Sequence, residues 1–217
     1  MAQPYSARSR AIEPFHVMAL LARANELQAA GHDVIHLEIG EPDFTTAAPI
    51  IKAGQAALAN GETRYTAARG LPALREAIAG FYATRYGLSI DPQRILITPG
   101  GSGALLLASS LLVDPGKHWL LADPGYPCNR HFLRLVEGAA QLVPVGPEVN
   151  YQLNADLVER YWDQDSVGAL VASPANPTGT VLDREQLASL AQAVRERHGH
   201  LVVDEIYHGL TYGMDAP

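Results

Sequence analysis

Residues 94–123, RILITPGGSGALLLASSLLVDPGKHWLLAD, decide the fold class of this chain. The stretch opens with the short apolar segment ILIT, passes through a glycine-rich turn into the helical segment SGALLLASSLLV, and ends with the strand-like segment WLLAD. A strand, a helix and a second strand in succession are typical of a βαβ unit, in which the two strands lie parallel. The stretch therefore predicts an α/β fold.

The same alternation continues toward the carboxyl end of the chain. Helix NRHFLRLVEG and strand QLVPV follow, and then strand VGALVAS, helix DREQLASLAQAVRERHG and strand HLVVDE. Upstream, hydrophobic periodicity and turn residues predict helices over residues 15–30, 49–58 and 71–86 and a short strand over 34–39. We expect a largely parallel sheet sandwiched by helices, incomplete at the C-terminus because such a sheet usually continues after TYGMDAP.

Composition excludes several classes of partner. With 217 residues, 47% of them hydrophobic, the chain can bury a sizeable core, and its net charge of −7 argues against nucleic acid. No apolar run approaches the roughly 20 residues that span a bilayer, so no membrane partner is expected. The single cysteine, Cys128, cannot form an internal disulfide, which fits a cytoplasmic location. His32 and His36 would lie about 13 Å apart in a strand, which argues against a metal site.

Two loops that follow predicted strands carry groups suited to a ligand, and ligands of parallel α/β sheets bind beyond the carboxyl ends of the strands. Gly101 and Ser102 lie where a strand runs into a helix, so free N–H groups and the helix dipole there favour a phosphate. The alternative is a glycine turn capped by Ser102. Asn176, between two prolines in SPANPTG, would present its amide to a ligand oxygen, unless the segment is an ordinary Asn-Pro turn.

A third such loop begins with DEIY at residues 204–207. The carboxylate of Asp204 at the end of an apolar strand is costly unless it has a partner. One βα unit separates Asn176 from Asp204, so the two strand ends can be neighbours. Paired with a ring nitrogen, Asp204 would keep a pyridinium protonated and make it an electron sink. Tyr207 could turn toward the same ligand, or it could be a half-buried core tyrosine.

Six short motifs run along nearly the whole chain in one order. They are GEPDF (40–44), RYTAARGLPALREAI (64–78), PGGSGAL (99–105), DPGYP (123–127), SPANPTG (173–179) and DEIY (204–207). In this order they resemble the class I/II aminotransferases, a family of fold-type I enzymes that use pyridoxal 5'-phosphate (PLP). The resemblance implies these cofactor contacts: Gly101 and Ser102 to the phosphate, Tyr126 to the ring face, Asn176 and Tyr207 to the 3-hydroxyl oxygen, and Asp204 to the pyridine nitrogen.

The resemblance also implies a substrate class, an assembly and a domain division. The small-molecule substrates would be an amino acid and a 2-oxo acid, with Gly40 bordering the substrate carboxylate. Tyr65 would reach the phosphate in the partner subunit, which implies a homodimer. Residues 1–45 would form an N-terminal arm and small-domain segment, and residues 46–217 a partial PLP-binding large domain.

One departure from the family pattern concerns the catalytic lysine. The family forms its Schiff base through a lysine in a pattern like Ser-x-Ser-Lys and binds the substrate carboxylate through a later arginine, and neither segment is found here. The only lysines are Lys52, on an early helix, and Lys117, before strand WLLAD at the amino end of the sheet. We therefore expect no catalytic residue in this chain and no transaminase turnover from it alone.

Three other functions remain open on the sequence. The chain could be a catalytically inactive, truncated PLP-binding or dimerisation module, or part of a fold-type I lyase or decarboxylase. A remote alternative is an NAD-dependent dehydrogenase, because Gly101 and Gly103 follow a strand and Asp123 ends the next one. In that pattern the third glycine is missing, since Leu106 occupies its place.

Overall fold

The computed structural model describes residues 5–213 and forms two compact units. One unit holds the residues up to Phe15 and those from Gly100 onward, and the other holds His16–Pro99. The division expected between residues 45 and 46, which separates an N-terminal arm and small-domain segment from a partial large domain, stays a prediction. Within the described residues, no helix is long and apolar enough to cross a membrane.

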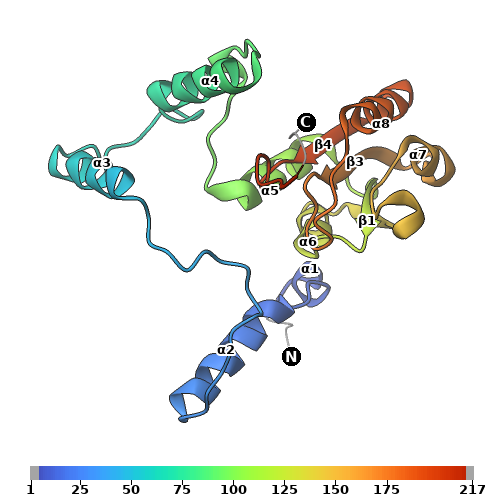
Figure 1. The fold of residues 1–217 in the computed structure, drawn as a ribbon. Helices are drawn as coiled ribbons and strands as arrows, with labels where there is room; N and C mark the ends of the chain where they lie inside the picture. The colour runs from blue at the N-terminus through green and yellow to red at the C-terminus, as the bar shows by residue number, and fades with distance from the viewer. Residues whose placement is uncertain (1–4, 214–217) are drawn as a thin grey trace. The chain divides into compact units, whose positions relative to one another are not determined.

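A four-stranded parallel sheet forms the centre of the larger unit (Figure 1). Its strands are β1 (His118–Asp123), β2 (Ala139–Pro144), β3 (Ser166–Ala172) and β4 (His200–Asp204), in the spatial order β2-β1-β3-β4. The inner strands β1 and β3 are the most buried, as their apolar runs HWLLAD and SVGALVA require. The expected α/β fold with a parallel sheet is confirmed.

Helices cover both faces of this sheet. Successive residues of β1 point to opposite faces, so Trp119 and Leu121 join one core cluster and Leu120 joins the other. The first cluster packs against α5 (Gly100–Leu112) and α6 (Cys128–Leu135), and the second against α7 (Ala155–Tyr161) and α8 (Arg184–Glu196). All three β1 side chains are at most 5% exposed, which places the core at the sheet centre.

Side-chain caps fix where two of these helices begin. Asp183 accepts a hydrogen bond from the backbone N–H of Gln186, and the Gln186 side chain accepts one from the Asp183 N–H, which makes a capping box ahead of α8. The Asn154 side chain accepts a single hydrogen bond from the Leu157 N–H at 2.9 Å and so caps α7. The sequence reading missed α7, although Asn154 ahead of Ala155–Tyr161 is an N-cap signal.

The other unit is helical. Its elements are α2 (His16–Ala29), α3 (Ala48–Ala59), α4 (Pro72–Tyr86) and the 3-10 turn η1 (Pro92–Arg94), so the three helices expected there are confirmed. The strands expected over 34–39 and at ILIT do not form among the described residues. A strand forms only where a neighbouring strand supplies backbone hydrogen-bond partners. The segment 34–39 has no such neighbour among the described residues, and its Ile35 and Leu37 side chains are more than 80% exposed. The larger unit also has a short α1 (Ala7–Arg10) and the 3-10 turn η2 (Pro147–Val149).

Candidate active site

The strand order places a topological switch point between β1 and β3. The chain leaves β1 toward β2 on one side and leaves β3 toward β4 on the other, although β1 and β3 are neighbours. The loops that follow these two strands therefore diverge and leave a crevice outside their carboxyl ends. In open α/β sheets this is where ligands bind.

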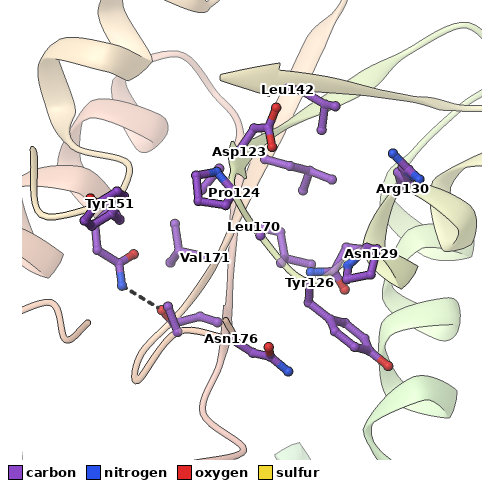
Figure 2. A pocket seen from close by; sticks show the side chains of 17 residues that line it. Asp123, Pro124, Tyr126, Asn129, Arg130, Leu142, Tyr151, Leu170, Val171 and Asn176 are labelled. Atoms are coloured by element: carbon purple, nitrogen blue, oxygen red, sulfur yellow. Dashed lines mark hydrogen bonds between the residues drawn. The ribbon is translucent and has the colours of Figure 1, made fainter. Parts of the chain in front are cut away.

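A pocket of about 220 Å³ occupies this position. Its walls come from the ends of β1 and β3, the loop 123–127, the start of α6 and the loop that carries Asn176. Figure 2 shows the side chains of Tyr126 and Asn176 extending to the same side of this pocket. Two residues expected to bind one ligand, from segments 50 residues apart in sequence, are thus brought together.

Tyr126 lines this pocket, and both its ring and its hydroxyl have neighbours. Phe15 packs edge-on against its ring, with centroids 6.0 Å apart and planes at 81°. A hydrogen bond with the Cys128 thiol, burial, and the nearby ionisable groups of Cys128, Tyr207 and Asp204 together raise the pKa of Tyr126 to about 12. The phenol is therefore neutral at physiological pH. Asp204 and Tyr207 lie close enough to influence its ionisation.

Asp204 and the Asn176 loop meet at neighbouring strand ends. Ala172, the last residue of β3, lies opposite Asp204 in the parallel register, and the Ser173 N–H donates to the Asp204 carbonyl at 3.1 Å. The Asp204 carboxylate oxygen Oδ1 accepts from the Ile206 N–H at 3.1 Å, which orients the acid at the end of β4. The structure thus places Asp204 one strand away from the Asn176 loop.

The remaining expected contacts lie elsewhere in the chain. Gly101 and Ser102 form the first turn of α5 and are exposed, and neither lines the pocket. They lie in the first turn of a 13-residue helix, where N–H groups have no partner within the helix, so the N–H groups of Gly101 and Ser102 suit an anion. Gly40 and Tyr65 belong to the unit His16–Pro99, where both are exposed. The individual roles of these residues stay predictions.

Two polar pocket residues escaped the sequence reading. Asn129 is 7% exposed, and its Oδ1 has no hydrogen-bond partner within the described chain. It lies in the first turn of α6, three residues after Tyr126, so the run DPGYPCN could have indicated it. Gln152 is 3% exposed and follows η2, eight residues after β2 ends in the sequence, so no sequence signal marks it. A buried amide oxygen facing a pocket without a partner suits a ligand that can donate to it.

Lys117 lies away from this pocket, and Lys52 belongs to the other unit. Lys117 immediately precedes β1, at the amino end of the sheet, and forms an ion pair with Asp165 at 2.8 Å. Six residues of extended strand separate it from Asp123, which amounts to about 20 Å. Lys52 lies exposed on α3 in the other unit. Lys117 therefore cannot reach the crevice, as the sequence led us to expect.

Known proteins resemble this chain in both sequence and fold. Valine–pyruvate aminotransferase of Mycobacterium tuberculosis is 38% identical over 201 residues, which cover 93% of this chain and 52% of that protein. A crystal structure of an aminotransferase from the same organism superposes with a TM-score of 0.94 at 36% identity, covering all of this chain and 55% of the other. Aspartate aminotransferase from Thermus thermophilus, solved with maleate, gives a TM-score of 0.93 at 34% identity. The match covers 99% of this chain and 56% of that one.

These relatives share one family, whose members use PLP, and the chain spans about half their length. The model of the family "Aminotransferase class I and II" matches residues 32–217. A match over most of the chain, together with relatives and solved structures of the same fold-type I architecture, establishes the relationship. The chain belongs to the class I and II aminotransferase family.

Proposed function

We propose that this chain forms the cofactor-binding part of a PLP-dependent aminotransferase, which moves an amino group between an amino acid and a 2-oxo acid. One observation carries the proposal. The topological switch point between β1 and β3 gathers Tyr126 and Asn176 into one pocket, with Asp204 at the adjacent strand end. These are an aromatic face, an amide and a carboxylate.

The residues present fit PLP. The neutral ring of Tyr126 offers a face for stacking, and Asn176 offers an amide donor to the 3-hydroxyl oxygen, joined by Tyr207. Asp204, held at the end of β4, would hold a proton on the pyridine nitrogen. When bound, PLP supplies an electron sink for the negative charge that develops on the substrate carbon. The chain's own contribution is to orient the ring and keep its nitrogen charged.

Several finer assignments belong to the same proposal. Gly101 and Ser102, in the first turn of α5, bind the phosphate through backbone N–H groups and a hydroxyl. Gly40 borders the substrate carboxylate, and Tyr65 reaches the cofactor phosphate of a partner subunit in a homodimer. The fully exposed Tyr65 ring supports a contact made outside its own unit. A cytoplasmic location is supported by the single cysteine.

Cofactor titration tests the proposal. We expect PLP, but not NAD, to change the near-ultraviolet absorbance of the protein in a saturable way. Asp204→Asn removes a charge-assisted hydrogen bond, worth about 1.5–3 kcal/mol, so PLP should dissociate about 10- to 150-fold more readily. Asp156→Asn, on the exposed side of α7, is the matched control and should leave the affinity unchanged. Equal affinities in all three proteins would contradict the proposed site.

The same samples test the role of the lysines. After incubation with PLP and borohydride, we expect no stoichiometric adduct on Lys52 or Lys117 and no transaminase turnover from this chain alone. Such an adduct with accompanying turnover would show that the active site lies elsewhere.

A further inference from the structure

The loop that carries Asn176 is held at its base by several hydrogen bonds. It leaves β3 after Ala172 and returns at Thr180, whose carbonyl accepts from the Ala175 N–H at 2.9 Å. The Gly179 N–H donates to the Ala175 carbonyl at 2.8 Å, which closes the tip. Asn176 lies within this closed turn, so its direction depends on how the two limbs of the loop are fixed.

Gln152 joins these two limbs from outside the loop. Its Nε2 donates to the Ala172 carbonyl at 3.0 Å, and this bond is the dashed line in Figure 2. The same nitrogen lies 3.2 Å from the Thr180 carbonyl and 3.2 Å from Thr180 Oγ1. One buried amide thus connects the end of β3 with the point where the loop returns.

The position of Gln152 is itself rigid. Its N–H donates to the Val149 carbonyl at 3.1 Å, and the next residue, Leu153, is fully buried in the core. Gln152 is 3% exposed, so its amide is held among neighbouring protein groups. Nearby Asn150 makes a weaker contact, 3.5 Å to the Val181 carbonyl on the surface. The bridge therefore depends on Gln152.

We infer that Gln152 is a positioning residue for the cofactor site, one that fixes the Asn176 loop and so aims the Asn176 amide into the pocket. The inference rests on the proposed function, because Asn176 is the group whose direction matters. Gln152 acts through Ala172 and Thr180. A misdirected Asn176 amide makes a poorer hydrogen bond to the cofactor, so loss of the bridge should be visible in cofactor binding.

The test compares Gln152→Met, which keeps the side-chain length and loses the donors, with Gln192→Met on the exposed side of α8 as a matched control. The first readout is amide hydrogen exchange of the protein without cofactor. We expect the segment 173–182 to exchange at least about tenfold faster in Gln152→Met, with α8 unchanged. Equal acceleration of α8 would indicate general destabilisation and would overturn the inference.

The second readout is the PLP dissociation constant, measured with Asn176→Ala beside the two methionine variants. We expect Asn176→Ala and Gln152→Met each to raise this constant about tenfold or more. The double variant should bind PLP as tightly as the single variant that binds it less tightly, because both changes act through the same amide. An Asn176→Ala variant that binds PLP normally would refute the proposed function. A Gln152→Met variant that binds normally while Asn176→Ala does not would refute the positioning role alone.

If Gln152→Met does not fold, Thr180→Val supplies a second test, because it removes the Oγ1 acceptor of Gln152 together with the 2.9 Å contact to Thr178 Oγ1. Thr178→Val removes only the latter contact and is its control. Residues 173–182 should exchange faster in Thr180→Val than in Thr178→Val, and equal exchange in the two variants would overturn the inference.

Discussion

The ionisation of Tyr126 offers a sharp test of how the site is built. The hydrogen bond with Cys128 is the largest of the causes that raise the pKa of this phenol from 10.0 to about 12. At pH 11 a phenol with a pKa of 12 is about one tenth ionised, whereas one with a pKa of 10 is about nine tenths ionised. Cys128→Ala removes the hydrogen bond and should shift Tyr126 toward the second value.

The shift also has a consequence for stability. The folded state holds the Tyr126 proton more tightly than the unfolded state does. The contribution of the phenol to the free energy of unfolding is therefore complete below pH 10 and is lost as the pH rises through about 12. The unfolding free energy should fall more steeply over this range in the unmodified protein than in Tyr126→Phe.

The assay is an NMR titration of the Tyr126 ring carbon, with Tyr126→Phe used to assign the signal and circular dichroism used to confirm folding at each pH. Cys128→Ser keeps a hydroxyl in place of the thiol and should retain most of the raised pKa. A Tyr126 pKa near 10 in the unmodified protein, or one that Cys128→Ala leaves unchanged, would refute the reasoning.

Three substitutions test the scaffold by chemical denaturation. Gly168→Ala places a methyl group against the His200 carbonyl and 2.7 Å from Trp119 Nε1, and we expect a loss of about 1–3 kcal/mol. Asp183→Ala removes the capping box of α8 and should cost about 0.5–2 kcal/mol, with an effect under 0.3 kcal/mol contradicting the assigned cap. Ser173→Ala leaves the buried Leu182 N–H without its acceptor, so a cost of about 1–3 kcal/mol is expected, and an unchanged midpoint would argue against that bond.

The sheet could be predicted from the sequence because its strands are locally unambiguous. Strands such as HWLLAD and SVGALVA are short apolar runs bounded by turn residues, and both faces of the inner strands are buried. The segments 34–39 and ILIT carry a similar pattern and do not form strands here. Pairing is a tertiary property, and the sequence of one segment does not reveal whether a partner lies beside it.

The candidate site shows the same limit. Tyr126, Asn176 and Asp204 follow strands, so the rule that ligands bind at carboxyl strand ends could select them. Gln152 follows a 3-10 turn, and its role depends on two carbonyls that lie 20 and 28 residues further along the chain. Asn129 has an unpartnered buried oxygen only because of how α6 packs. The bridge made by Gln152 leaves no local pattern, whereas the run DPGYPCN at least marks the position of Asn129.

A structure of the protein with PLP bound is the most direct test of the proposed cofactor site. We predict that the pyridine ring lies in the crevice between the ends of β1 and β3, against Tyr126, with its nitrogen toward the Asp204 carboxylate and its 3-hydroxyl oxygen toward Asn176. PLP bound at any other edge of the sheet, or with its ring nitrogen directed away from Asp204, would contradict the account.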